Sequence, residues 1–220
     1  MKQTQGEKSE RSQVAILQAA LQLFSKQGYR GTSIREIATA AGLSTGNVYH
    51  HFPDKEALFN TLLGEYWKAI DSPDFPFNKA LAAGAFPDDL EALARATEES
   101  VRVYRPYVAL IYVDVVELEG THIRKFYSEM SSRFANVLNW PIPGDALKGQ
   151  LAPGFHPNTA LMLVSRIFLH YFAVEILFGV PRQFGLDTPT AMAEVSEILR
   201  FGLLRRDADK AKPAKPARRR

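Results

Sequence analysis

Apolar residues recur at intervals of three and four along most of the chain, the period of an α-helix that packs on one side. In the segment 12–27, for example, Val14, Leu17, Leu21 and Phe24 follow one another at steps of 3, 4 and 3 residues. The pattern predicts further helices at 34–40, 45–51, 54–71, 88–105, 107–118, 121–139, 158–178 and 188–205. We therefore expect an all-α protein of about nine helices. Proline-rich stretches predict irregular loops at 72–87 and 140–157.

The segment 32–55, TSIREIATAAGLSTGNVYHHFPDK, predicts two short helices joined by a tight turn. Ser33 and Glu36 have the spacing of a capping box at the start of the first helix. Gly42 permits the positive φ that a sharp reversal needs, and Ser44 can cap the second helix. These features predict a helix-turn-helix, whose second helix enters the major groove of DNA.

The inner face of the second helix is apolar, because Val48 and Phe52 lie four residues apart. Its remaining positions are polar or amphipathic, as a recognition helix requires. An ordinary helical hairpin is the alternative, but it leaves Tyr49, His50 and His51 as accidental surface residues.

The run from about residue 11 to 63 resembles the DNA-binding domain of the TetR family of bacterial transcriptional regulators. Its residues follow the pattern GTSxxxIAxxAGLSxGxVYxHFxxKxxL, and Ala19, Phe24 and Gly28 also match. The resemblance implies a three-helix helix-turn-helix domain at 11–55 and an effector-binding and dimerisation domain at 56–205, connected by the helix 54–71. It implies a homodimer that binds a palindromic double-stranded DNA operator, represses transcription and is released by a small hydrophobic or aromatic effector. The alternative is a DNA-binding dimer without an effector, controlled by a protein partner or by abundance.

Within the motif, the resemblance assigns two kinds of DNA contact. Base-reading positions are Arg35, Thr45, Gly46 and Asn47, and phosphate-binding positions are Thr32, Ser33, Tyr49, His50, His51 and Lys55. Asn47 could pair bidentately with adenine, while Arg35 could read guanine, contact a phosphate or remain an exposed charge. A lysine in a first helical turn opposes the helix dipole, and a phosphate beside Lys55 would account for it.

The middle helices are rich in aromatic residues, which suggests a cavity for the effector. Buried tyrosine hydroxyls need partners, so several tyrosines are an unusual choice for a sealed core. The candidates are Tyr66, Tyr104, Tyr107, Tyr112, Phe126, Phe134 and His170. A solid core without a cavity is the alternative.

The last two predicted helices carry more apolar surface than one protomer needs, which suggests a dimer interface. The candidates are Leu161, Phe168, Tyr171, Val195, Leu199 and Leu203. The alternative is that these residues serve the core of the same chain.

Charge is distributed unevenly along the 220 residues. The net charge is +2 for residues 1–60, −5 for 61–204 and +6 for 205–220. An acidic body beside a mildly basic head would orient the head toward DNA. Composition also predicts a flexible N-terminus at 1–10 and a disordered basic tail at 206–220.

Several classes of function find no support in the residues. The chain has no cysteine, and His50 and His51 are adjacent and diverge on a helix, so we expect no metal site and no cofactor. Without a phosphate loop, a nucleophile motif or a convergent carboxylate pair we expect no enzyme activity and no catalytic residues. The apolar segment 160–180 is interrupted by Ser165, Arg166, His170 and Glu175, so it predicts a buried helix and no membrane association. The N-terminus lacks the apolar stretch of a signal peptide, and we expect a cytoplasmic protein.

Overall fold

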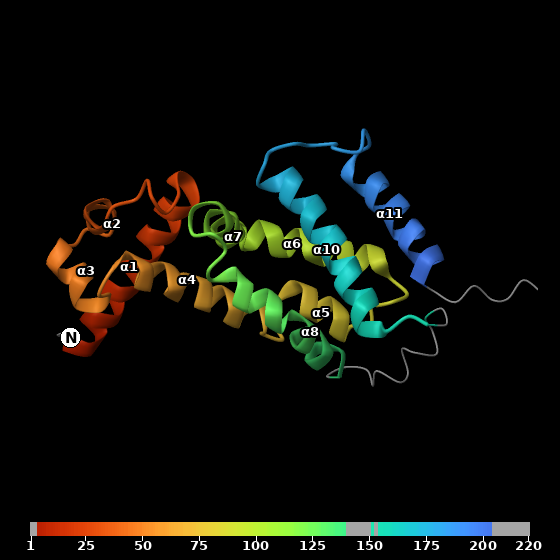
Figure 1. Ribbon diagram of the computed structural model, residues 1–220, viewed down its shortest axis with the longest axis horizontal. Coiled ribbons are helices and arrows are strands. Elements are labelled where there is room, and N and C mark those ends of the chain that lie inside the picture. The colour runs from red at the N-terminus through yellow and green to blue at the C-terminus, as the bar shows by residue number, and fades with distance from the viewer. Residues whose placement is uncertain (1–3, 140–150, 152–153, 204–220) are drawn as a thin grey trace, which may run out of the picture.

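The computed structural model describes residues 4–139, 151 and 154–203, and this part of the chain is all-helical, as predicted. Its helices are α1 (Gln5–Gln27), α2 (Ile34–Ala40), α3 (Thr45–His51), α4 (Lys55–Ile70), α5 (Pro76–Ala82), α6 (Leu90–Val103), α7 (Arg105–Glu117), α8 (Ile123–Asn139), α10 (Pro157–Ile176) and α11 (Thr188–Leu203). Figure 1 shows α1–α3 gathered at one end, α10 and α11 at the other, and α4 running from the first group into the second.

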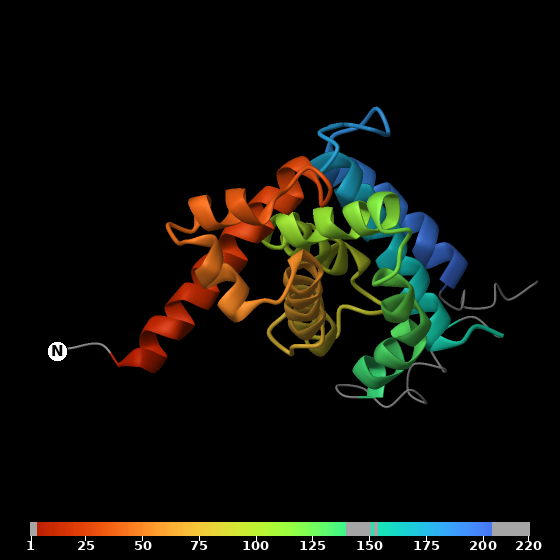
Figure 2. The same cartoon turned by 60° about the vertical axis from the view of Figure 1, so that its left-hand side comes forward.

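The first helix starts earlier than predicted. Thr4 caps α1 by accepting from the Glu7 N–H at 3.3 Å, while the Glu7 carboxylate accepts from the Thr4 N–H at 2.9 Å. This capping box makes residues 5–10 helical, which corrects the expectation of a flexible terminus there. The N-terminal end of α1 projects beyond the rest of the N-terminal domain (Figure 2).

The expected loop at 72–87 contains the helix α5, which sequence reasoning missed. Pro76 occupies the first turn, where a missing N–H costs nothing, and Phe77 and Leu81 face the core. Prolines that indicated a loop therefore start a helix. The expected 140–157 loop falls largely outside the described residues, and the basic tail 206–220 falls wholly outside them.

Two main hydrophobic cores divide the protein. The first joins α1–α4 around the fully buried Phe24, Ile37, Val48 and Phe59, and it also takes in Leu110 of α7. The second lies among α5, α6, α10 and α11 and includes Phe168. Burying each of these larger side chains contributes about 1.5–3 kcal/mol. Because Leu110 belongs to the first core, α7 is packed against the N-terminal domain.

Among the described helices, α10 is long and apolar enough to cross a membrane on length and composition alone. Its mean hydropathy over the relevant window is 1.4, and 39% of that window is buried inside the fold. The helix therefore contributes one side to the core of this chain and leaves apolar surface on the other.

Candidate nucleic-acid interface and effector cavity

The helix-turn-helix is held in shape by the local contacts that its sequence predicts. Ser33 accepts from the Glu36 N–H at 3.2 Å, and the Glu36 carboxylate accepts from the Ser33 N–H at 2.8 Å. Gly42 has φ +69°, and Ser44 accepts from the Asn47 N–H at 3.2 Å. These features confirm the predicted caps and turn.

The recognition helix α3 is seated by its inner face. Val48 is fully buried and Phe52 is 4% exposed, as predicted, whereas Tyr49 on the outer side is 55% exposed. An open groove runs between α3 and the loop that joins α1 to α2, and Arg30, Arg35, Thr45, Tyr49 and Lys55 are among its lining residues. This is the surface that a half-buried recognition helix would present to a duplex.

The predicted base-reading residues differ in how well they are placed. Arg35, Thr45 and Gly46 are exposed, and the Arg35 guanidinium has no hydrogen-bond partner within the described chain. Asn47 is half-buried, and its Oδ1 is buried with no hydrogen-bond partner among the residues that the structure describes. A bidentate contact with adenine needs both amide atoms at the base edge, so this conformation of Asn47 does not present it.

Two predicted phosphate contacts are corrected by the structure. Thr32 is 1% exposed, and its hydroxyl donates to the Gly28 carbonyl at 2.8 Å. The side chain is therefore buried and stabilises the loop between α1 and α2, and it does not face a phosphate. Lys55 donates from Nζ to the carbonyls of Tyr29 at 2.8 Å and Thr32 at 2.9 Å. Its ammonium also lies 4.3 Å from the centre of the Tyr29 ring.

These contacts explain the lysine in a first helical turn without a phosphate. Burial lowers the pKa of Lys55, while the carboxylates of Glu117 and Glu36 act in the opposite direction. The hydroxyl of Ser33 is also engaged, because it donates to Glu36 Oε2 at 2.7 Å. Of the other phosphate candidates, Tyr49 and His50 are exposed and His51 is half-buried.

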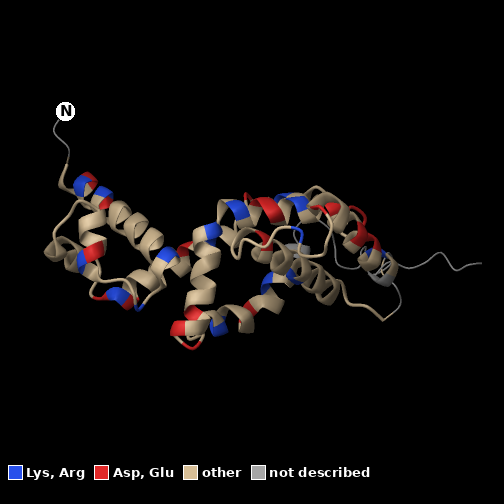
Figure 3. Cartoon of the chain, turned by 90° about the horizontal axis from the view of Figure 1, so that it is seen from above, with Lys and Arg blue, Asp and Glu red and all other residues tan. Residues whose placement is uncertain are grey.

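Charged residues of both signs are interspersed along the described helices. Figure 3 shows Lys and Arg interspersed with Asp and Glu on both the N-terminal domain and the helices beyond it. The candidate DNA surface is therefore marked by individual exposed residues around α3.

A cavity of about 130 Å³ lies among α4, α5, α6, α7, α8 and α10. Apolar cavities on this scale can hold an aromatic ring. Of the predicted effector residues, Tyr66, Phe126 and Phe134 line it. Trp67, which was not among the effector candidates, also lines the cavity and stacks on Phe126 with ring centres 4.0 Å apart.

The other four effector candidates do not line this cavity, which corrects the prediction for them. Tyr107 stacks behind Tyr66, and its hydroxyl donates to Glu65 Oε2 at 3.1 Å. Tyr104 packs against Phe75 and Tyr66, Tyr112 packs against Phe178, and His170 is exposed. Aromatic content identified the region but could not say which rings face the empty space.

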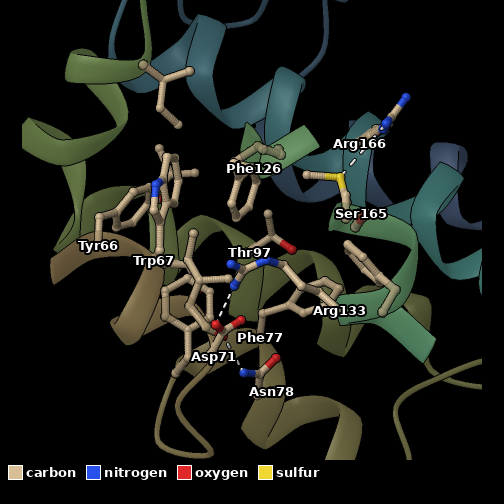
Figure 4. Close-up of a pocket in the computed structure, with 18 of the residues that line it drawn as sticks. Tyr66, Trp67, Asp71, Phe77, Asn78, Thr97, Phe126, Arg133, Ser165 and Arg166 are labelled. Atoms are coloured by element: carbon tan, nitrogen blue, oxygen red, sulfur yellow. Dashed lines mark hydrogen bonds and ion pairs between the residues drawn. The ribbon is translucent and has the colours of Figure 1, made fainter. Parts of the chain in front are cut away.

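Polar residues of the cavity were also missed. Arg133 of α8 forms an ion pair with Asp71 at the C-terminal end of α4 (Figure 4). Asn78 of α5 donates from Nδ2 to the carbonyls of Ile70 at 2.7 Å and Ser72 at 2.8 Å, and so holds that end of α4. The only sequence signal for Arg133 is its i, i+4 spacing from Glu129, which is common on exposed helix faces.

The predicted dimer residues mostly face inward. Leu161 and Phe168 are fully buried, Tyr171 is 3% exposed, Leu199 is 8% exposed, and Val195 packs against the same core. These residues serve the core of their own chain, which corrects the prediction. The side chain of Leu203 lies outside the described part. The outward faces of α10 and α11 instead carry Leu163, 48% exposed, and Ile198, 71% exposed.

Within the described residues, no group of three or more His, Asp or Glu side chains could hold a metal ion.

Comparison with known proteins identifies the N-terminal domain. Residues 16–62 match the family model for bacterial regulatory proteins of the tetR family. The repressor KstR2 of Rhodococcus jostii is 30% identical over 135 residues, which cover 61% of this chain and 64% of that protein. The regulator AcrR of Shigella flexneri is 49% identical over 57 residues, covering 26% of this chain and 25% of that protein.

Similarity at the level of structure extends over most of the chain. The crystal structure of NalD, the secondary repressor of the MexAB-OprM multidrug efflux pump in Pseudomonas aeruginosa, has a TM-score of 0.60 and 26% identity. The structural alignment covers 90% of this chain and 98% of NalD. The matched part of this chain spans less than two thirds of the length of KstR2 and of AcrR.

The N-terminal domain of this chain is a DNA-binding domain of the tetR family of bacterial regulatory proteins, as the resemblance indicated, and the chain as a whole is similar in structure to the repressor NalD. These relatives are transcriptional regulators and not enzymes, which agrees with the prediction that the chain has no catalytic activity.

Proposed function

We propose that the protein is a sequence-specific DNA-binding repressor of transcription that acts in the cytoplasm. The observation that supports this best is the seating of α3: its apolar side is buried through Val48 and Phe52, and its other side borders an open groove with an exposed Arg35. KstR2 and NalD are both named as repressors, which supports the same role here.

The repressor is proposed to act as a homodimer on a palindromic operator. The exposed Leu163 and Ile198 lie on α10 and α11, at the end of the protein away from α3 (Figure 1). A symmetric contact through that end would leave both recognition helices free to enter successive major grooves, about 34–36 Å apart on B-DNA. Large exposed apolar residues on neighbouring helices favour such a contact.

A small hydrophobic or aromatic effector is proposed to release the operator. The aromatic-lined cavity favours this over control by a protein partner or by abundance, since a solid core was the expectation for a regulator without an effector. An effector can act only by binding one conformation of the protein more tightly than the other.

Selection from a random duplex library by the full chain tests DNA binding, followed by fluorescence anisotropy on the selected site. We expect two half-sites one helical turn apart and an affinity that falls steeply with salt. Arg35→Ala should cost about 1–3 kcal/mol if the guanidinium reads a guanine, and should relax preference at one position.

Arg102→Ala is the matched control, because Arg102 lies on α6 and pairs with Glu98 at 2.7 Å. It should leave both affinity and preference unchanged. The proposed function would be rejected if the unsubstituted chain enriched no sequence and showed no salt-sensitive retention of duplex DNA.

A further inference from the structure

One ion pair inside the cavity links two helices (Figure 4). Arg133 extends from α8 to Asp71, the residue that caps the C-terminal end of α4. Glu129, one turn earlier on α8, accepts from the Arg133 Nη2 at 3.2 Å. Trp67, Phe77 and Phe126 surround the pair, and the rest of the wall is mainly aromatic or aliphatic. The link therefore joins α4 to α8 through the space that a ligand would enter.

Arg133 retains a donor that no described residue satisfies. Its Nε is buried and has no acceptor among the described residues. A buried N–H without an acceptor is costly, and native structures rarely leave one. A guanidinium binds a carboxylate best through two parallel N–H donors, and Nε can supply one of them. An incoming carboxylate would therefore satisfy a donor that Asp71 and Glu129 leave open.

Asp71 and Arg133 differ in how far they are exposed to solvent, and this difference favours a negatively charged ligand over a positively charged one. The Asp71 side chain is 51% exposed, so once released it can be solvated by water. The Arg133 side chain is only 23% exposed, so without Asp71 its charge is poorly solvated and is balanced by Glu129 alone. A ligand anion can replace Asp71 at Arg133, whereas a ligand cation would have to take Asp71 away and leave Arg133 with Glu129 alone.

A second guanidinium adds positive charge at the edge of the cavity. Arg166 of α10 lies on the far side of the cavity from Asp71 in Figure 4, and no carboxylate pairs with it in the described part of the chain. Its Nη2 lies 3.8 Å from the Met130 sulfur. This charge also favours a negatively charged ligand over a positive one.

We propose that the effector is an amphiphilic organic anion whose apolar body fills the cavity and whose carboxylate displaces Asp71 from Arg133. The inference rests on the proposed function, because it names the ligand class of the same cavity. Displacement unlinks the C-terminal end of α4 from α8, while Asn78 keeps that end attached to α5. Since α4 begins next to the recognition helix, the exchange changes the constraint on the DNA-binding domain.

Calorimetric titration of the full chain with matched probes tests the proposal. The probes are benzoate and 2-naphthoate, their neutral carboxamides, and 2-naphthylmethylammonium, with tryptophan fluorescence as a second readout because Trp67 lines the cavity. We expect at least one carboxylate to bind about tenfold or more tightly than its carboxamide, as a hydrogen-bonded charge pair implies. The cation should bind most weakly.

Three substitutions, at Asp71 and Arg133, separate displacement of Asp71 from simple packing of the ligand. Asp71→Asn removes the competing carboxylate and should tighten carboxylate binding while leaving carboxamide binding unchanged. Arg133→Gln should abolish the preference for the carboxylate, and Arg133→Lys, which keeps the charge but loses Nε, should retain only part of it. Arg102→Gln is the control for losing an arginine elsewhere, and thermal melting confirms that each variant is folded.

The proposal is overturned if the carboxamide binds as well as the carboxylate, if the cation binds best, if Asp71→Asn weakens carboxylate binding, or if no carboxylate binds. Operator retention without ligand, measured in parallel, separates this failure from that of the proposed function. A chain that retains duplex DNA but ignores the carboxylates remains a repressor with a different effector, whereas a chain that retains no DNA fails the proposed function itself.

Discussion

The backbone N–H of Arg30 donates to the Glu117 carboxylate at 2.6 Å, and the Arg30 guanidinium donates to the Glu117 carbonyl at 3.0 Å. Arg30 lies in the loop between α1 and α2, and Glu117 is the last residue of α7, 87 positions further along the chain. The end of α7 is thereby attached to the loop that borders the candidate DNA groove. Any displacement of α7 would be transmitted to that loop.

Gly28 is the position where this attachment leaves no room for a side chain. It has φ +81° and ψ 172°, a region that essentially only glycine occupies, and a Cβ there would collide with the Glu117 carboxylate. Gly28→Ala should therefore lower the free energy of unfolding by more than about 2 kcal/mol. Gly42→Ala is the control, since Gly42 also has positive φ (+69°) but open space around its Cβ.

Urea unfolding of both variants, alone and combined with Glu117→Ala, measures the two contributions. Removing the Glu117 carboxylate should restore part of the loss in Gly28→Ala and none of the loss in Gly42→Ala. Equal losses for the two glycine variants would show that Glu117 does not press on Gly28.

Lys55 is predicted to stabilise the fold and not to bind a phosphate. Lys55→Met keeps the length of the side chain but removes both hydrogen bonds to the α1–α2 loop, at a cost of about 1–3 kcal/mol. Thermal melting without DNA should show the loss, and the slope of log affinity against log salt should not change. Lys26→Met, on the exposed last turn of α1, should change neither. If Lys55→Met left the melting temperature unaltered and reduced the slope of log affinity against log salt by about 1, Lys55 would be a phosphate contact after all.

Stability should fall at alkaline pH through the tyrosines that join α4 and α7. Burial, and then the nearby Glu65, raise the pKa of Tyr107 to about 12 from its usual 10.0. Burial also raises the pKa of Tyr66. The folded state holds these protons more tightly than the unfolded state, so their contribution is complete below pH 10 and is lost as the pH rises toward 12.

Tyr107→Phe tests this dependence. It should cost about 0.5–1.5 kcal/mol at neutral pH through the lost hydrogen bond to Glu65, and it should make the decline above pH 10 shallower. Urea midpoints measured from pH 7 to pH 11 give both values. Tyr49→Phe, which changes an exposed hydroxyl on α3, is the control. A decline of equal steepness in Tyr107→Phe and the unsubstituted chain would contradict the assignment.

Contacts between residues close together in the sequence could be predicted, whereas contacts between residues far apart could not. The caps at Ser33 and Ser44 join residues three apart, so they can be read directly from the local pattern. The pair Arg133–Asp71 joins residues 62 positions apart, and a lone arginine near a glutamate gives no sign of it. The recognition helix was therefore predictable, whereas the polar part of the cavity required the tertiary fold.

The outward faces of the last helices were not predictable for a different reason. Apolar residues surround α10 almost completely, so its periodicity does not distinguish Leu161, which is buried, from Leu163, which is 48% exposed. The same ambiguity affects Leu199 and Ile198 on α11. Only the packing of α10 against α6 and α8 decides which side remains outside.

The dimer contact is predicted to use the exposed side of these helices. Ile198→Asp and Leu163→Asp place a charge in that contact and should convert the protein from dimer to monomer without unfolding it. Size-exclusion chromatography with light scattering measures the mass. Val116→Asp is the matched control, since Val116 is 78% exposed on α7, away from the proposed contact. Leu199→Ala, at a buried position, should instead cost about 2–5 kcal/mol of stability.

The monomeric variants should also lose binding to the palindromic site while keeping weak, salt-sensitive attraction to DNA, because each half-site alone offers only part of the contact. If Ile198→Asp and Leu163→Asp both remained dimeric while Val116→Asp dissociated, the contact would lie at α7. If the unsubstituted chain were monomeric at working concentrations, the proposed pairing of recognition helices would be wrong, since one α3 cannot read two half-sites at once.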